Sequence, residues 1–280
     1  GSGISGGPHG ARQGTSILFG GTGYEKVSEL LCRIASLDNS GKPCCSYIGA
    51  GGAGHYVKIV HNGIEYAEMQ LLAEAYQLLR YYCQVEPQEI AGILKGWPEP
   101  YMTSYLLEIT ADILTQKDGD EPFIDKVLDK AGQKGTGSWS VASAMDLGLP
   151  SSTISESIMA RYLSVMKDER VSAEKKYNLP RQNFSGDKQN FINNVRDGYR
   201  GARIINHAIG FHLLREAKSI NEWQKDLSEI ARIWTRGCII QSHLMGRLEI
   251  TLESDKSVLL HDDIVEHLQS STTTLKQLVT

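Results

Sequence analysis

Hydrophobic residues recur with a helical period along most of the chain. From Gly54 onward the apolar positions follow the three-to-four-residue spacing of amphipathic helices. The longest such stretch runs from about residue 55 to residue 83 and ends ahead of Pro87, because a proline disfavours the helical conformation in the residue before it. Further helices are predicted over residues 88–95, 103–116, 123–131, 141–147, 151–172, 188–219, 221–233, 237–254 and 264–279. The pattern predicts a mainly α fold in which the long helix is central and largely buried.

The first fifty-three residues follow a different pattern. Two short apolar runs, 15–19 and 44–48, are bounded by glycine-rich loops, and the stretch 24–35 between them carries one apolar helical stripe: Val27, Leu30, Leu31 and Ile34. This order predicts strand, helix, strand, the trailing end of an α/β unit that is too short to form such a domain alone. We therefore divide the chain into residues 1–53, a short α/β remnant, and residues 54–280, a large all-helical domain.

Composition excludes several classes of function. The formal net charge of -4 argues against a generally basic surface for nucleic acid. No run approaches the roughly 18 apolar residues of a membrane span, and no secretory signal opens the sequence. The five cysteines are odd in number and fit no zinc motif, which is typical of reduced thiols in a cytosolic protein. We expect a cytoplasmic protein without bound metal, nucleic acid or membrane.

Two segments match the glycine pattern G-x-G-x-x-G, namely residues 1–6 and 49–54. The first has no strand before it. The second follows an apolar run and opens a helix, but a dinucleotide site also needs a second strand that ends in Asp or Glu about twenty residues further on. That stretch lies inside the long predicted helix. We favour a tight turn into the helix over nucleotide binding.

A faint internal similarity links residues 57–64 with residues 202–209. A duplication would explain it, and so would two amphipathic helices that converged on one pattern. The residues alone leave both explanations open.

The long helix carries an unusual set of polar residues on one face. Lys58, His61, Asn62 and Glu65 are spaced i, i+3, i+4 and i+7, and Tyr66 and Met69 extend the same face. A polar face is usually a solvated one. This face, however, offers a cation, an imidazole, an amide and a carboxylate within two turns, and the opposite stripe is apolar. The composition favours a site for a small polar substrate.

The segment Lys134-Gly135-Thr136-Gly137 is a weaker candidate for binding an anion. Glycines free the backbone, and Thr136 and Lys134 supply a hydroxyl and a cation. The plain alternative is a turn at the C-terminus of a helix. Arg161 is a lone cation on a predicted helix, with nothing local to mark it as functional.

These residues resemble one known family, 6-phosphogluconate dehydrogenase. Residues 54–66, Gly-His-Tyr-Val-Lys-Ile-Val-His-Asn-Gly-Ile-Glu-Tyr, look like the signature helix of that family. Residues 5–7, 131–137 and 160–161 resemble further family segments in the family's order and spacing. The similarity extends over nearly the whole chain, and thirteen contiguous residues of mixed chemistry make it specific.

The resemblance implies oxidative decarboxylation of 6-phosphogluconate to ribulose 5-phosphate with NADP, carried out by a homodimer. It implies that Lys58 is the general base and Glu65 the acid that protonates the enediol, with His61 and Asn62 orienting the reacting hydroxyl. The remaining implied contacts are Ser5, Gly6 and Gly7 for the carboxylate end, and Tyr66, Lys134, Thr136 and Arg161 for the phosphate. A lysine base must be neutral near pH 7, which burial and a neighbouring cation both favour.

The chain also departs from the family pattern. The family begins with a Rossmann domain, of which residues 1–53 match only the last strand-helix-strand portion, and it ends in a tail that reaches into the partner subunit and is not matched here. Ser138 stands where the family usually has Lys, and residues 18–21 differ from the usual motif. We therefore expect this segment alone to be inactive, and no residue is assigned to the main cofactor site. The alternative is a non-catalytic interaction or scaffold protein that kept the helical domain.

Overall fold

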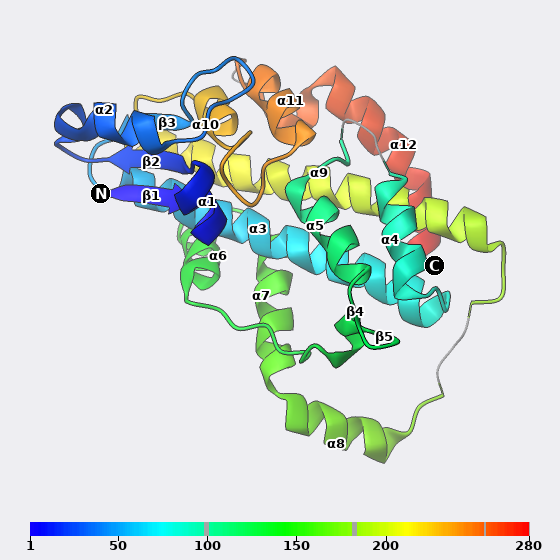
Figure 1. Ribbon diagram of the computed structural model, residues 1–280. Helices are drawn as coiled ribbons and strands as arrows, with labels where there is room; N and C mark the ends of the chain where they lie inside the picture. The colour runs from blue at the N-terminus through cyan, green and yellow to red at the C-terminus, as the bar shows by residue number, and fades with distance from the viewer. Residues whose placement is uncertain (98–100, 181–183, 255, 280) are drawn as a thin grey trace.

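Two long helices dominate the molecule. The computed structural model describes residues 1–97, 101–180, 184–254 and 256–279. In it α3 (Ala53–Gln77) and α9 (Lys188–Ile220) run side by side in opposite directions through the molecule, with shorter helices around them (Figure 1). A main hydrophobic cluster forms where they meet, and it includes Val60 and Ile64 of α3 and Phe211 of α9. The prediction of a central, largely buried helix that bears Lys58 is confirmed.

A three-stranded sheet covers the first turns of α3. Its strands are β1 (Ser2–Ser5), β2 (Ser16–Gly20) and β3 (Cys45–Gly49), in the order β1-β2-β3, with β1 antiparallel and β3 parallel to β2. Helix α2 (Tyr24–Ile34) connects β2 to β3, so the predicted strand-helix-strand order is confirmed. The sequence did not reveal β1 or the short helix α1 (Gly7–Gln13), because five glycines in the first ten residues obscure any periodic pattern.

Most predicted helices exist with shifted ends. The described helices are α4 (Pro87–Lys95), α5 (Tyr105–Leu114), α6 (Thr136–Asp146), α7 (Ser152–Val165), α8 (Lys167–Tyr177), α10 (Leu227–Ile233), α11 (His243–Thr251) and α12 (Asp262–Val279). A π-helical turn, η1 (Leu78–Tyr82), ends α3, and a 3-10 turn, η3 (Val258–Leu260), precedes α12. After Gly54, the described strands are only those of one small hairpin, β4 (Lys117–Asp118) and β5 (Glu121–Pro122).

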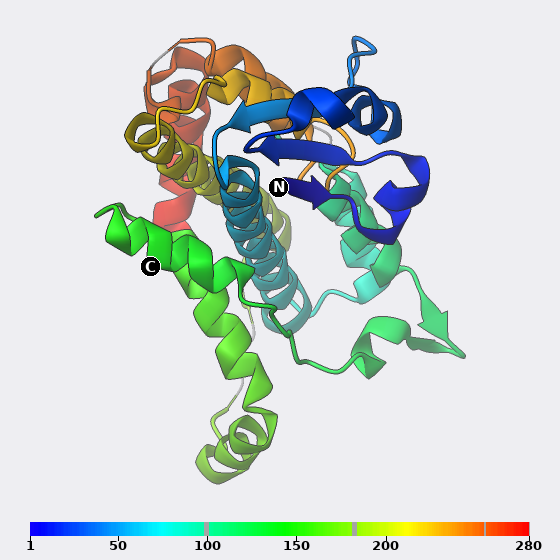
Figure 2. The same cartoon turned by 90° about the vertical axis from the view of Figure 1, so that its left-hand side faces the viewer.

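Two helix predictions were wrong in an instructive way. The predicted helix 123–131 is a 3-10 turn, η2 (Phe123–Lys126), followed by irregular chain, and its apolar residues Phe123, Val127 and Leu128 are exposed. A short helix needs a surface that buries its apolar face, and none covers this one. The predicted helix 151–172 breaks at Met166 into α7 and α8, and α8 buries no residue at all. Helix α7 begins against α3, and α8, at the far end of α7, lies away from the rest of the molecule (Figures 1 and 2).

A glycine allows α3 to begin directly against the sheet. A Cβ atom on Gly54 would lie 2.1 Å from the carbonyl oxygen of Leu18 in β2, far inside van der Waals contact. The glycine pattern at 49–54 therefore ends in a packing contact, and the predicted tight turn into the helix is confirmed, with α3 beginning at Ala53. Gly52, two residues earlier, has nothing within 4 Å of its Cβ position.

A buried ion pair joins α3 to α9 further along. Arg203 Nε donates to Glu68 Oε1 at 2.7 Å, and both side chains are fully buried. Arg203 Nη1 also donates to the carbonyl oxygen of Tyr101 at 2.6 Å, which ties the segment before α5 to the same pair. His207 Nε2 lies 3.7 Å from Glu68 Oε2. Among the described helices, none has both the length and the apolar character that crossing a membrane requires.

The contact at Gly54 yields a stability prediction. Gly54→Ala should lower the free energy of unfolding by about 1–3 kcal/mol, the usual cost of overpacking, because the added methyl group meets the rigid backbone of β2. Gly52→Ala, the matched control in the same loop, should change it by less than about 1 kcal/mol. Urea unfolding followed by circular dichroism measures both. Equal effects of the two substitutions would show that the close approach of α3 and β2 is not what requires glycine.

Candidate functional site

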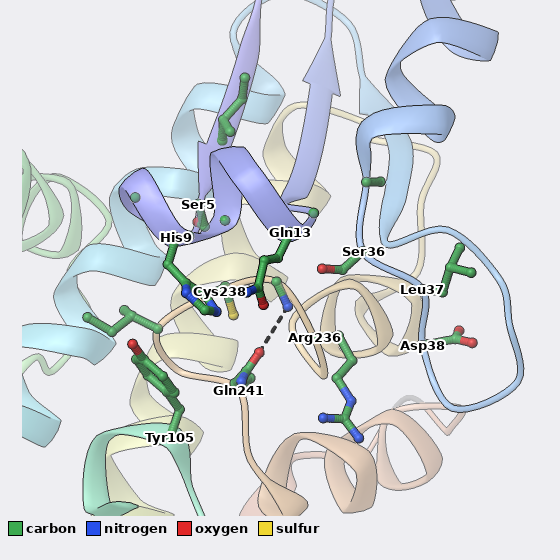
Figure 3. Close-up of a pocket in the computed structure, with 18 of the residues that line it drawn as sticks. Ser5, His9, Gln13, Ser36, Leu37, Asp38, Tyr105, Arg236, Cys238 and Gln241 are labelled. Carbon is green, nitrogen blue, oxygen red and sulfur yellow. Dashed lines mark hydrogen bonds between the residues drawn. The ribbon is translucent and has the colours of Figure 1, made fainter. Parts of the chain in front are cut away.

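A cavity of about 880 Å³ lies between α3, α1 and the segment that joins α10 to α11 (Figure 3). Helix α3 contributes Lys58, Asn62 and Glu65 to its wall, and the β1–α1 turn contributes Ser5, Gly6 and Gly7. Six of the eleven residues proposed from the sequence therefore line one cavity. They come from segments about fifty residues apart, which the packing of α3 against β1 brings together.

His61 lies at the centre of this arrangement and is fully buried. Its Nδ1 atom lies 3.1 Å from Lys58 Nζ, 3.3 Å from Asn62 Oδ1 and 3.5 Å from Glu65 Oε2. Its Nε2 atom lies 3.3 Å from Ser5 Oγ. Burial, and after it the charge of Lys58, lowers the pKa of His61 well below its usual range, so the ring is neutral at physiological pH. A neutral ring between these groups fixes their relative positions without adding a second positive charge.

Lys58 and Glu65 have shifted proton affinities for one shared reason. Burial lowers the pKa of the Lys58 amine, although the Glu65 carboxylate opposes the shift. Burial likewise raises the pKa of Glu65, although Lys58 and Arg161 oppose that shift. Desolvation disfavours the charged form of both groups. The pair is thus an amine that gives up its proton more readily and a carboxyl group that keeps its proton longer, a combination suited to general base and general acid chemistry.

A second group of predicted residues lies around the N-terminus of α6. The Arg161 guanidinium stacks over the ring of Tyr66 at 3.7 Å and donates to the carbonyl oxygen of Gly132 at 2.5 Å. Gly137 lies against the same ring, because a Cβ atom there would be 2.9 Å from Tyr66 Cδ2. Thr136 is the first residue of α6. Gly135 is the N-cap of this helix, with a left-handed φ of 93°, and the exposed Lys134 comes directly before it. This glycine segment is therefore a helix N-terminus and not the C-terminal turn of the plain alternative.

The α6 N-terminus has the electrostatic character of an anion site. The first backbone N–H groups of a helix have no partner within the helix, and the helix dipole adds partial positive charge there. Lys134 and Arg161 add two full charges. Tyr66 directly follows Glu65 on α3, so this group lies beside the cavity without lining it.

Several cavity residues were not found from the sequence. His9 and Gln13, four residues apart on α1, project into the cavity, and Tyr105, Arg236 and Gln241 line it as well (Figure 3). The spacing of His9 and Gln13 is a helical signal that became readable only once α1 was known. Arg236 and Gln241 lie between α10 and α11, where the sequence predicted a helix from residue 237 but the structure begins α11 only at His243. Within the described residues, no group of three or more His, Cys, Asp or Glu could hold a metal ion.

Comparison with known proteins gives consistent matches. The family profile of the 6-phosphogluconate dehydrogenase C-terminal domain matches residues 54–280. The decarboxylating 6-phosphogluconate dehydrogenase of Lactococcus lactis is 45% identical over 270 residues, which is 94% of this chain and 57% of that protein. The Shigella flexneri protein of the same name is 46% identical over 251 residues, 89% of this chain and 54% of that protein. The chain thus spans a little more than half the length of the curated relatives it matches.

A solved structure is similar over the entire chain. It is Plasmodium falciparum 6-phosphogluconate dehydrogenase, studied in its apo form, with its cofactor NADP+ and with its substrate 6-phosphogluconate. The TM-score is 0.94 and the sequence identity 34%, and the match covers 100% of this chain and 62% of the other.

The electrostatic coupling across the α3 face yields a pH prediction. In Lys58→Met the pKa of Glu65 should rise further, because the ammonium that favours the charged carboxylate is lost. The carboxyl carbon of Glu65, followed by NMR in protein labelled at glutamate, should therefore titrate at higher pH. The exposed Lys26→Met on α2 is the control and should leave the titration unchanged. An unchanged or lower pKa of Glu65 in Lys58→Met would contradict the proposed coupling.

Proposed function

The chain belongs to the 6-phosphogluconate dehydrogenase family, and we propose on this basis that it serves the NADP-dependent oxidative decarboxylation of 6-phosphogluconate to ribulose 5-phosphate. One observation carries the proposal: Lys58, Asn62 and Glu65 surround the buried His61 next to Ser5, in the wall of one cavity. We further propose that residues 1–53 are the end of a Rossmann-type domain, that residues 54–280 form the substrate-binding and dimerisation domain, and that the protein is cytoplasmic.

The proposed roles follow from the proton affinities on α3. Lys58, whose pKa is lowered by burial, accepts the proton of the substrate hydroxyl. Glu65, whose pKa is raised by burial, donates a proton to the enediol carbon after carbon dioxide has left. His61 and Asn62 orient the hydroxyl, and Ser5, Gly6 and Gly7 hold the carboxylate end. When bound, NADP supplies the hydride acceptor. The cavity is near the upper end of the roughly 300–1,000 Å³ usual for ligand sites, a size that supports the binding of a sugar acid.

The phosphate is proposed to bind at the N-terminus of α6, to Tyr66, Lys134, Thr136 and Arg161. The stacking of Arg161 on Tyr66 supports this role, because it holds a guanidinium beside the free backbone N–H groups of the helix. The distance along α3 from Lys58 to Tyr66 is about 12 Å at the usual helical rise, which suits a six-carbon acid with a terminal phosphate.

A homodimer is proposed for a separate reason. Helix α7 and Met166 directly after it expose one apolar stripe at helical spacing: Met159, Tyr162, Leu163 and Met166 are each about half exposed. Trp139 and Met145 of α6 are exposed as well. Exposed apolar residues in this number are characteristic of an interface, and a second copy would cover them through a symmetric contact.

A binding measurement tests the proposed substrate site directly, because it does not require bound NADP as turnover does. The chain should bind 6-phosphogluconate, and Lys134→Ala or Arg161→Ala should each weaken binding by about 1.5–3 kcal/mol, the value of one lost charged hydrogen bond. Isothermal titration calorimetry measures both, with Lys26→Ala as a control for net charge. If the chain does not bind 6-phosphogluconate at millimolar concentration, or if neither substitution weakens binding, the result would favour the alternative of a non-catalytic scaffold protein.

The dimer proposal has its own test. Leu163→Asp places a carboxylate in the centre of the α7 stripe and should shift the protein from dimer to monomer in sedimentation velocity at micromolar concentration. The control is Ile220→Asp, at the exposed end of α9 and outside the stripe, which should stay dimeric. A monomeric parent protein, or a dimer that tolerates Leu163→Asp, would rule out this face as the interface.

A further inference from the structure

Arg236 is a cation placed between two cavities. It lines the 880 Å³ cavity described above and also a second cavity of about 590 Å³, and the two share Asn39, Tyr105, Arg236 and Gln241 as walls. The Arg236 side chain is exposed and points away from His9 and Gln13 (Figure 3). Its guanidinium donates from Nη2 to Asn39 Oδ1 at 3.1 Å. Within the described part of the chain, no carboxylate pairs with it.

The neighbouring Arg232 shows what a structural arginine looks like in this segment. It is buried and pairs with two carboxylates, Asp38 at 2.6 Å and Glu229 at 2.7 Å. Asp38 lines the first cavity together with Arg236. Its carboxylate oxygens, however, already accept hydrogen bonds from Arg232 and from the backbone N–H groups of Ser40 and Lys42. These contacts hold the pKa of Asp38 down, at about 2. The charge of Arg236 is therefore left uncompensated where the two cavities meet.

The second cavity is lined by ionisable groups of both signs. Its lining includes His243 and Arg247 of α11, and Glu108 of α5 is its acidic residue. Arg247 is paired with Asp263 at 2.8 Å, so Arg236 is the dominant cation. The N-termini of α5 and α11 meet in this wall, because Tyr105 N donates to the carbonyl oxygen of Gln241 and His243 N to that of Thr103. The Ser104 and Ser242 side chains also cap these ends by accepting from Leu107 N and Met245 N, so the two helices contribute the field of their dipoles and Arg236 supplies the direct donor.

We propose that the junction of these two cavities is a second anion site, which binds a phosphate group through Arg236. It is separate from the site at α6, since none of Tyr66, Lys134, Thr136 and Arg161 lines either cavity. The ligand class is a phosphate ester. The phosphate could belong to a dinucleotide whose reacting end lies in the first cavity, or to a separate sugar phosphate. The guanidinium fork suits either source, because it donates two parallel hydrogen bonds to phosphate oxygens.

Pyrophosphate is the probe for this site, titrated into the full chain by calorimetry. A Lys134→Ala/Arg161→Ala background removes both cations at α6, so that remaining binding reports on the junction. In that background Arg236→Ala should weaken binding about tenfold, equivalent to about 1.4 kcal/mol. Arg236→Lys should weaken it less, because the charge remains while the fork is lost. Arg12→Ala removes the same charge from an exposed position outside both cavities and should have no effect.

The ligand source follows from two further titrations. If the phosphate belongs to a dinucleotide, Arg236→Ala weakens NADP+ binding and leaves 6-phosphogluconate binding intact. If it belongs to a sugar phosphate, saturating NADP+ leaves pyrophosphate binding unchanged. Equal losses in Arg236→Ala and Arg12→Ala, or no loss in either, would overturn the proposal. These outcomes do not depend on the proposed function, which stands or falls with Lys134, Arg161 and 6-phosphogluconate.

Discussion

The burial of α3 is the constraint on which the site depends. A helix with Lys58, His61 and Glu65 on one face would ordinarily turn that face to water. Here α9, α6, α7 and the sheet all pack against α3. Close contacts at small residues make this possible: a Cβ atom on Gly210 would lie 2.4 Å from Ile64 Cδ1, and one on Gly137 would lie 2.9 Å from Tyr66 Cδ2. Because this packing excludes water, it lowers the pKa of Lys58 and raises the pKa of Glu65. The burial of α3 therefore accounts for both the packing and the shifted pKa values.

The buried pair of Glu68 and Arg203 extends this arrangement one turn further along α3. Removing one partner from such a pair would leave a charge without water or counter-charge, so the pair fixes how α3 and α9 sit relative to each other. Because Arg203 also holds the carbonyl oxygen of Tyr101, the segment that leads into α5 takes its position from the same contact. Tyr105 at the start of α5 lines the cavity. The cavity walls formed by α3 and by the start of α5 are thus both held by Arg203.

The sequence predicted the helical domain and the polar face of α3, because both depend on local spacing. It favoured a substrate site over a solvated face, but it could not show which contacts bury that face, since these come from residues such as Gly137 and Gly210, which meet α3 from about 70 and 145 positions away. It failed at 123–131, where an apolar stripe exists but nothing covers it, and at Met166, where packing ends before the helical pattern does. Arg236 was missed because the property that distinguishes it, a charge without a counter-charge, exists only in three dimensions. The similar segments 57–64 and 202–209 lie on the two central helices.

The placement of His61 makes its ring a mechanical link. One ring nitrogen faces Ser5 at the end of β1, and the other faces Lys58 on α3. Any shift of the β1–α1 turn against α3 therefore alters the contacts of a single imidazole, and with them the local field at the amine beside it. Movement of the sheet relative to the helices would be transmitted to Lys58 as a change in basicity. In such an arrangement the basicity of Lys58 depends on how closely the β1–α1 turn packs against α3.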